Sequence, residues 1–255
     1  MSEDIRRDAY LGGRVLIAQP ARGYRAGVDP VFLAAACPAT PGQSVLELGC
    51  GVGTALLCLQ ARVADLRLCG IERQPAMADL ARQNAQGGVQ VFTGDLVQMP
   101  QALKEVSFDH VIVNPPYFLR TAGTSAPDPA REAAMGEDTP LQGWTDAARR
   151  RLRPKGWLTL IQRPERLSDV LAALGGGFGD LRILPIMPRA GRDASLFLLR
   201  ARKGSRAPLR ILSPVVMHAG AAHDQERQDY SVEIEQVLRQ PCAFPGFGDG
   251  GAVEH

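Results

Sequence analysis

Short apolar segments alternate with segments of helical periodicity through the middle of this 255-residue chain. Four apolar segments are predicted strands, at residues 44–48, 66–72, 89–95 and 108–113. The segments between them are predicted helices, at residues 54–63 and 75–86, with a short helix before the fourth strand. A strand followed by a helix and a further strand forms a crossover unit, which makes the strands parallel. The alternation therefore predicts an α/β fold with a mainly parallel sheet.

The second half of the chain continues this sheet and then changes its pattern. Its predicted elements are a helix at 141–152, a strand at 157–162, a helix at 164–177, strands at 180–188 and 194–203, a strand or extended arm at 209–218, and a helix at 230–241. No helix separates 180–188 from 194–203, so this pair is predicted to be antiparallel. Residues 121–140, rich in Ala, Gly, Pro, Ser and Thr, are predicted to form a mobile loop or lid.

The composition, 45% hydrophobic and 22% charged, is that of an ordinary globular protein. No apolar run approaches the roughly 18 residues of a membrane span, and the N-terminus lacks the apolar core of a signal peptide. We therefore expect a soluble cytoplasmic protein with no membrane partner. The five cysteines form no C-x-x-C pair and the four histidines are scattered, so we expect no metal site and no disulfide.

A glycine-rich sequence follows the first strand of the alternating region. In "ELGCGVG", residues 47–53, Gly49, Gly51 and Gly53 allow a sharp turn and a close approach of the backbone to a ligand, and the next helix offers free N–H groups. The spacing is G-x-G-x-G, not the G-x-G-x-x-G of dinucleotide sites. No phosphate-binding lysine follows. These features favour a nucleoside ligand that needs no pyrophosphate cradle.

Acidic residues end the next two strands. Glu72 lies 19 residues after Gly53, where an acid commonly accepts hydrogen bonds from ribose hydroxyls. Asp95 ends the third strand, where its carboxylate can meet the amino group of an adenine. The carboxyl ends of parallel strands form the ligand crevice in such sheets, so both acids are expected to face it.

The sequence Asn-Pro-Pro-Tyr, residues 114–117, follows the strand 108–113. A turn needs only one proline, whereas two successive prolines also stiffen the backbone. By itself, this tetrapeptide indicates either a rigid turn or an amine methyltransferase.

The glycine-rich sequence, Glu72, Asp95, "NPPY" and "LRPKGW" (152–157) together resemble class I S-adenosylmethionine-dependent methyltransferases, in particular the subset that methylates an exocyclic or amide nitrogen. The resemblance covers roughly residues 20–203. It implies a Rossmann-like, mostly parallel sheet of about seven strands with a terminal antiparallel hairpin, and S-adenosyl-L-methionine as the cofactor. The cofactor contacts that it implies are Asp29, Glu47, Gly49, Cys50, Gly51, Gly53, Glu72, Arg73, Asp95, Leu96 and Asn114.

The resemblance also assigns the catalytic residues, which are Asn114, Pro115, Pro116 and Tyr117. The target NH₂ group is a poor nucleophile until its nitrogen becomes pyramidal, because its lone pair is delocalised. The side-chain oxygen of Asn114 and the backbone oxygen of Pro115 would accept its two hydrogens, the prolines would hold the acceptors in place, and Tyr117 would stack on the flat target. Alignment for methyl transfer is then the main contribution, and neither a metal nor a strong base is required.

Three classes of amine remain open: adenine N6 in RNA, adenine or cytosine in DNA, and a glutamine side chain in a translation release factor. Another nucleobase amine, in DNA or rRNA, is an alternative to the N6 of a tRNA adenine. Release-factor glutamine methyltransferases carry a longer helical domain before the glycine loop, and DNA methyltransferases usually add a large reading domain. Only 43 residues precede Ser44, and fewer than 100 follow the strand 157–162, so we expect neither.

The flanking segments resemble one family more specifically. "GYRAGVDPVFLAAA" (23–36), with residues 188–218 and 230–238, resembles the small family that methylates N6 of an adenine beside the anticodon of a valine tRNA. The chain departs from this family at Pro30 and in the segment 121–140. Residues 28–37 are predicted to form a helix that Asp29 caps.

The resemblance implies RNA, and specifically tRNA, as the partner, and leaves the oligomeric state open. The residues expected to contact the RNA are Arg22, Tyr24, Arg25, Arg189 and Arg192. Residues 1–43 are predicted to form an extension, with strand character in residues 14–25, that packs on the active site. Residues 44–203 would form the methyltransferase core, and residues 204–255 an arm and helix of the same domain.

Overall fold

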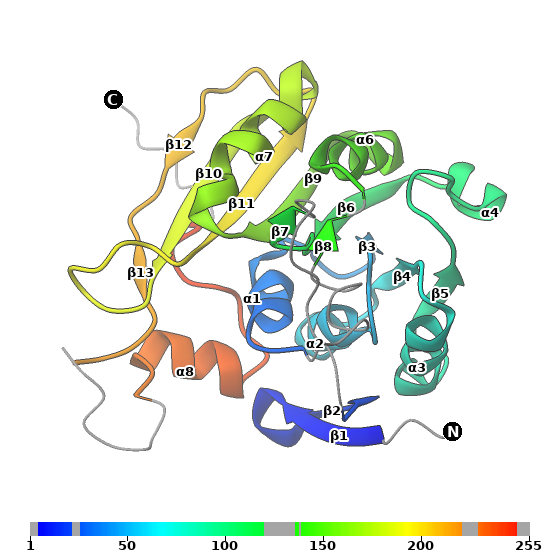
Figure 1. The fold of residues 1–255 in the computed structure, drawn as a ribbon, viewed down its shortest axis with the longest axis horizontal. Coiled ribbons are helices and arrows are strands. Elements are labelled where there is room, and N and C mark those ends of the chain that lie inside the picture. Colours follow the sequence, from blue (N-terminus) through cyan, green and yellow to red (C-terminus); the bar gives the residue numbers. More distant parts are fainter. Residues whose placement is uncertain (1–4, 22–25, 120–135, 138, 221–228, 249–255) are drawn as a thin grey trace.

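A mixed β-sheet forms the centre of the computed structural model, which describes residues 5–21, 26–119, 136–137, 139–220 and 229–248 (Figure 1). Its strand order is β12-β10-β11-β9-β6-β3-β4-β5, and β13 pairs with β10. The strands are β3 (Ser44–Leu48), β4 (Arg67–Glu72), β5 (Gln90–Thr93), β6 (Phe108–Val113), β9 (Leu152–Gln162), β10 (Phe178–Met187), β11 (Leu196–Lys203), β12 (Arg210–Ile211) and β13 (Val215–Val216).

The direction of the strands confirms the predicted fold class. Strands β5, β4, β3, β6 and β9 are parallel, whereas β11 is antiparallel to both β9 and β10. These seven strands match the predicted parallel sheet with its antiparallel hairpin. The two-residue strands β12 and β13 extend the sheet because residues 210–216 run parallel along the outer edge of β10.

Helices cover both faces of the sheet. One face packs against α1 (Asp29–Ala36), α2 (Thr54–Arg62), α3 (Pro75–Ala85) and α8 (Val232–Arg239). The other packs against α4 (Gln101–Lys104), α6 (Leu141–Arg151) and α7 (Leu167–Leu174). Short 3₁₀ turns complete the helical elements: η1 (Leu11–Gly13), η2 (Pro164–Arg166) and η3 (Gly175–Gly177). The predicted helix at 164–177 is thus divided among η2, α7 and η3.

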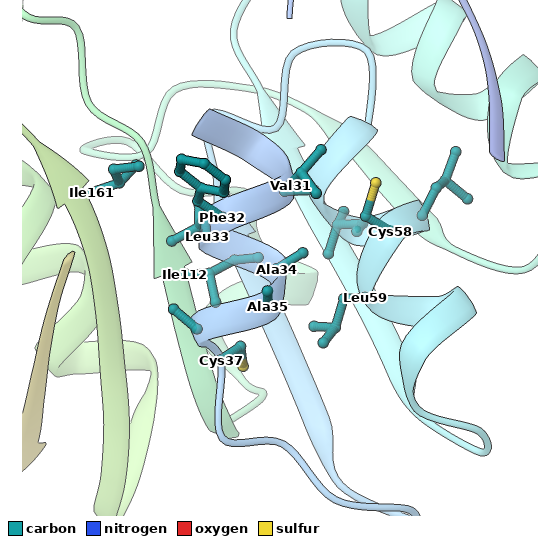
Figure 2. Close-up of a cluster of buried hydrophobic side chains, with 14 of the residues drawn as sticks. Val31, Phe32, Leu33, Ala34, Ala35, Cys37, Cys58, Leu59, Ile112 and Ile161 are labelled. Atoms are coloured by element: carbon teal, nitrogen blue, oxygen red, sulfur yellow. The ribbon is translucent and has the colours of Figure 1, made fainter. Parts of the chain in front are cut away.

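Helix α1 is the most deeply buried helix segment of the first face. After Asp29 its sequence is apolar on all sides, and residues 30–36 are all buried. Such a helix has no solvent-facing stripe and has to be enclosed. Figure 2 shows Phe32 and Leu33 between the sheet residues Ile112 and Ile161, while Cys58 and Leu59 of α2 lie on the other side.

The chain's last described segment, residues 240–248, packs back onto α1. The backbone N–H of Phe244 donates to the carbonyl of Ala35 (2.9 Å), and the Phe244 ring meets Phe32 edge-on, with 5.1 Å between centroids. The Arg200 guanidinium lies 3.9 Å from the ring centroid of Phe247. The segment therefore closes the outer side of α1.

A two-stranded hairpin precedes α1. Strands β1 (Ile5–Tyr10) and β2 (Val15–Pro20) are antiparallel and form their own sheet. Asn84 of α3 fastens β2 by accepting from the N–H of Ala18 (2.8 Å) and donating to its carbonyl (2.9 Å), and it also donates to the carbonyl of Val52 in the glycine loop (3.0 Å). This amide holds the hairpin beside the loop.

Two local predictions are wrong. Asp29 does not cap α1: Val28 is the N-cap, Asp29 lies in the first turn, and no side-chain capping bond forms, because the carboxylate is engaged elsewhere. Strand β9 begins at Leu152, five residues before the predicted Trp157. The "RPKG" sequence does end α6. Strand β9 nevertheless runs through it, with a φ of 64° at Lys155 and a shift of register against β6.

The predicted loop at 121–140 falls mostly outside the described residues. β7 (Phe118–Leu119), just before it, pairs in parallel with β8 (Gly136–Glu137), which lies within it.

Candidate active site

Most of the predicted cofactor and catalytic residues lie along the carboxyl edge of the parallel strands. Strands β3, β4, β5 and β6 pair with one another in parallel, so the segments that follow them meet at one edge. These segments are the glycine loop after β3, Glu72 at the end of β4, Asp95 after β5 and Asn114 after β6.

The glycine loop adopts backbone conformations that favour glycine. Gly49, Gly51 and Gly53 have φ values of 67°, 53° and 86°. The N–H groups of Gly49 and Cys50 both donate to the carbonyl of Ile71, at 2.8 and 3.0 Å, which holds the loop against the end of β4. A Cβ atom on Gly49 would lie 2.7 Å from the Trp144 ring, so this position lacks room as well as a suitable φ for other residues.

Glu72 joins the loop to the next strand. Its Oε2 accepts the N–H of Gly51 (2.9 Å) and its Oε1 accepts the N–H of Gln74 (2.8 Å), and the residue is 8% exposed. Each carboxylate oxygen keeps a second lone pair after these bonds. The carboxylate is therefore fixed at the sheet edge and still able to accept ribose hydroxyls.

Glu47 and Cys50, both predicted to contact the cofactor, have buried side chains that are 4% and 5% exposed. Burial, and then the neighbouring Glu72 carboxylate, raise the pKa of Glu47 well above its ordinary value. The thiol of Cys50 faces β4, because a Cβ on Gly70 would lie 2.7 Å from its sulfur. Its backbone is engaged as well, since the N–H donates to Ile71 and the carbonyl accepts the N–H of Gly53 (2.8 Å). Glu47 and Cys50 stay predicted cofactor contacts.

Asp95 occupies the corresponding position after β5. Its Oδ1 accepts the N–H of Val97 (2.7 Å), which fixes the turn that follows, and the side chain is half-buried. Leu96 is buried in the core of the second face, whereas Arg73 is exposed. The three residues stay predicted cofactor contacts, and Asp95 has the position best suited to an adenine amino group.

Asp95→Ala is expected to weaken S-adenosylmethionine binding by about 10- to 150-fold, since a hydrogen bond to a charged group contributes about 1.5–3 kcal/mol. Isothermal titration calorimetry measures the change. Asp79→Ala, which removes an exposed carboxylate of α3 from its pair with Arg82, serves as the control and should leave the affinity unchanged. Equal affinities for the two variants would contradict a role of Asp95 in cofactor binding.

The Asn-Pro-Pro-Tyr segment leaves β6 at the same edge. Asn114 is half-buried, and its carboxamide makes no hydrogen bond to any residue that the structure describes. The carbonyls of Pro115 and Pro116 both accept from Nε2 of Gln162, at 3.3 and 3.4 Å. The segment thus presents an amide and a neighbouring carbonyl on a backbone that the adjacent strand holds.

Tyr117 is anchored by residues from two other elements. Its hydroxyl donates to Oδ2 of Asp29 (2.5 Å), and its carbonyl accepts from Nη1 of Arg166 (3.5 Å). The Arg163 guanidinium lies 5.4 Å from the ring centroid. One face of the ring is therefore occupied by a cation, and the predicted stacking on a substrate requires the other face.

Asp29, which stays a predicted cofactor contact, accepts a hydrogen bond from the Tyr117 hydroxyl. Burial raises the pKa of its carboxyl group, opposed by the hydrogen bond from Tyr117 and the positive charge of Arg163. The contact connects the start of α1 to the end of the Asn-Pro-Pro-Tyr segment.

Asp29→Asn is expected to make stability less dependent on pH. A carboxyl group with a raised native pKa contributes stability that is complete below its unfolded value of about 3.9 and is lost as pH rises through the native pKa. Asparagine keeps an acceptor for Tyr117 but has no such titration. The free energy of unfolding of the wild type, relative to Asp29→Asn, should therefore fall as pH rises above about 4, as measured by urea denaturation; a constant difference would refute this.

The residues predicted to bind RNA have different placements. Arg22, Tyr24 and Arg25 lie outside the described residues. Arg189 is 9% exposed, and its Nη1 donates to the carbonyls of Ala219 (2.5 Å) and Gly220 (3.0 Å), so it ties down residues 219–220. Arg192 is exposed in the turn between β10 and β11, which lies at the catalytic edge because Phe197 pairs with Gln162.

Sequence analysis missed several residues of this edge, notably Gln162, Arg163, Arg166 and Asn84. The sequence does hold one signal: Gln162 ends a predicted parallel strand, the same position that identified Glu72 and Asn114. Within the described ranges, no helix is long and apolar enough to cross a membrane, and no three His, Cys, Asp or Glu residues gather as metal ligands would.

The site fits S-adenosylmethionine, because a glycine loop open to close approach lies beside two carboxylates at the carboxyl edge. Residues 45–126 match a protein family described as "Methyltransferase domain". A solved structure described as a "predicted O-methyltransferase" from Agrobacterium tumefaciens is 27% identical, with a TM-score of 0.69, and the match covers 85% of this chain and 98% of that one.

Curated relatives narrow the family. The tRNA1(Val) (adenine(37)-N6)-methyltransferase of Aeromonas hydrophila is 31% identical over 188 residues, which are 71% of this chain and 77% of the relative. The enzyme of the same name from Porphyromonas gingivalis is 32% identical over 175 residues, 64% of this chain and 68% of the relative. The chain therefore belongs to the family of S-adenosylmethionine-dependent N-methyltransferases that contains these two enzymes.

Proposed function

We propose that this protein methylates the exocyclic N6 of an adenine in RNA, and that the RNA is a tRNA modified beside its anticodon. The observation that carries the proposal is the placement of Asn114, which Pro115 follows directly, at the edge that also holds the glycine loop and Glu72. The names of the two curated relatives, which specify adenine 37 of a valine tRNA, support the substrate.

Two neighbouring acceptors favour nitrogen over oxygen as the methylated atom. An NH₂ group has two hydrogens, one for the Asn114 side-chain oxygen and one for the Pro115 carbonyl, whereas a hydroxyl has only one. Acceptors on both hydrogens favour the pyramidal nitrogen whose lone pair is available for attack. The Agrobacterium protein is described as a predicted O-methyltransferase, which would act on an oxygen. A hydroxyl substrate at the present site would leave one of the two acceptors unused.

The residues of the edge divide the remaining work. The glycine loop and Glu72 would hold the cofactor's ribose side, and Asp95 its adenine. S-adenosylmethionine, when bound, supplies an electrophilic methyl group. Asn114 and Pro115 would keep the target nitrogen in line with that group, which is the step where a fixed geometry accelerates transfer. The methylated nitrogen is acidic, so its proton needs no dedicated base.

An adenine has to leave its stack to reach Asn114, and the bases of a single-stranded loop do so at low cost. The Tyr117 ring follows directly after the two prolines at this edge. Arg163 and Arg192 are exposed at the same edge, where guanidinium groups suit phosphate contacts. Together they favour a flipped base from an RNA loop.

Methyl transfer from labelled S-adenosylmethionine to separate pools tests the proposal. Unmodified tRNA, rRNA, DNA and a protein extract are each incubated with the enzyme, and the labelled product is identified by mass spectrometry. We expect N6-methyladenosine in tRNA. If the label appears as methylglutamine in protein, or in DNA or rRNA while tRNA stays unlabelled, the proposed tRNA substrate is wrong and the labelled pool contains the substrate.

Binding of tRNA is expected to weaken steeply with salt. Each phosphate contact contributes about 0.7–0.9 to the slope of log K against log salt, because counterions are released. Filter binding between 50 and 200 mM KCl measures the slope, and the affinity for S-adenosylmethionine alone, with its single net charge, serves as the control. A tRNA affinity that does not change with salt would contradict recognition of the RNA backbone.

A further inference from the structure

We propose that Gln162 is a positioning residue, which holds the Pro115 carbonyl where it accepts a hydrogen of the target amine. The inference rests on the acceptor role of Pro115 in the proposed function. It concerns a residue at the end of β9 that lies beside the Asn-Pro-Pro-Tyr segment and outside it in sequence.

Two successive prolines create a need for an outside donor. Strands β6 and β9 pair in parallel up to Val113 and Leu160, and the ladder stops there. Beyond that point Pro115 and Pro116 have no N–H groups, so they cannot continue the ladder, and their carbonyls need a donor from elsewhere. The side chain of Gln162 supplies it, with Nε2 at 3.3 Å from the Pro115 oxygen and 3.4 Å from the Pro116 oxygen.

The orientation of the Gln162 amide is fixed by its surroundings. Its Oε1 accepts the N–H of Arg163 (2.9 Å), so the nitrogen has to face the two prolines. The residue is 0% exposed, and its backbone pairs with Phe197 of β11. A buried amide with both ends bonded has one stable position, and the strand that carries it is held from both sides.

This contact leaves the Pro115 carbonyl able to act on a substrate. A carbonyl oxygen has two lone pairs, and one Nε2 group shared between two carbonyls takes one from each. Nε2 carries two hydrogens, one for each carbonyl, and both distances lie just beyond the usual range of about 2.7–3.2 Å. The second lone pair of Pro115 remains for the amine. Asp29 and Arg166 anchor Tyr117, whereas Gln162 contacts the acceptor carbonyl itself.

Two variants separate donation from packing. Gln162→Met keeps the size of the side chain but removes the donor, and Gln162→Glu replaces the NH₂ with an acceptor. We expect kcat for methyl transfer to fall by about 100-fold in both, as for a small misplacement of a reacting group, while the affinity for S-adenosylmethionine stays unchanged. Thr159→Val is the matched control, since Thr159 lies in the same strand, is also 0% exposed, and its hydroxyl has no partner among the described residues.

A spectroscopic readout tests the contact without any substrate. Pro115–Pro116 is the single Pro-Pro pair in the sequence, so a protein labelled with ¹³C and ¹⁵N on proline alone gives one carbonyl–nitrogen cross peak, which reports the Pro115 carbonyl. Loss of a hydrogen bond should move that carbon upfield in Gln162→Met but not in Thr159→Val. If Gln162→Met does not fold, Gln162→Asn, which retracts the amide by one methylene, takes its place.

The outcomes distinguish this inference from the proposed function. A shifted peak together with reduced kcat and unchanged cofactor affinity supports the positioning role. An unshifted peak, or a turnover equal to that of Thr159→Val, overturns it. The wild type could also label a pool other than RNA. If the Gln162 variants then shift the peak and reduce kcat on that pool, the positioning role of Gln162 is supported and the RNA substrate is rejected. If no pool is labelled, the peak alone decides whether Gln162 holds the carbonyl.

Discussion

Asn114→Ala is expected to reduce methyl transfer by about 10²–10³-fold, comparable with the loss of one preorganised polar group at a reacting centre. The side chain is half-buried at the end of β6 and makes no hydrogen bond within the described part of the chain, so its removal should disturb the fold little. Its effect should appear in the chemical step. Single-turnover transfer to unmodified tRNA measures the rate, and calorimetry measures cofactor affinity.

The matched variant is Asn114→Asp, which keeps oxygen acceptors at the same place. It should retain a clearly larger share of the activity than the alanine variant, because a carboxylate also accepts hydrogens from an NH₂ group. If Asn114→Ala turned over at a near-normal rate, the assignment of Asn114 as an acceptor for the target amine would be wrong. A loss of cofactor affinity as large as the loss of rate would make it a cofactor residue instead.

Gly49→Ala is expected to lower the free energy of unfolding by about 2–5 kcal/mol, from a left-handed backbone and an overfilled contact acting together. The φ of Gly49 is 67°, and a Cβ atom there would lie 2.7 Å from the Trp144 ring. Trp144 is 8% exposed and packed in the core between α6 and the sheet, so it has little room to withdraw. Urea denaturation without cofactor measures the change.

Gly51→Ala separates the two causes. Gly51 also has a positive φ, 53°, but a Cβ atom there would meet nothing within 4 Å. Only the backbone term applies, and the loss should be about 1–2 kcal/mol. If the two variants lose the same free energy of unfolding, the Trp144 ring can move aside for the added Cβ. The close packing between the loop and α6 would then contribute little to stability.

Sequence periodicity was sufficient for the central fold because buried parallel strands and their helices have clear patterns. It failed where pairing or packing decides the structure. Strand β1 was not predicted, since Ile5–Tyr10 contains Arg6, Arg7 and Asp8 and lacks regular alternation, yet it pairs along all of β2. Strand β9 extends back to Leu152 through a proline and a glycine because β6 provides a partner there.

The candidate site shows the same division. Glu72, Asp95 and Asn114 were predictable, since each follows a strand whose carboxyl end is recognisable in sequence. Asp29 and Tyr117 are 88 residues apart in sequence, and Gln162 lies 47 and 46 residues after the two prolines that it contacts. No local sequence pattern predicts contacts between residues so far apart. Arg189 stays a predicted RNA contact, and its guanidinium donates to the carbonyls of Ala219 and Gly220, a pairing that its sequence position does not indicate.

The packing of residues 240–248 on α1 bears on how the protein folds during synthesis. Helix α1 emerges from the ribosome early, but Phe244 and Phe247, which cover its outer side and the neighbouring Arg200, emerge some 200 residues later. Contacts so distant in sequence form late and slow folding. Since α1 also carries Asp29, the contact that secures Tyr117 should gain its full rigidity only after this last segment docks, so that catalytic competence would come at the end of folding.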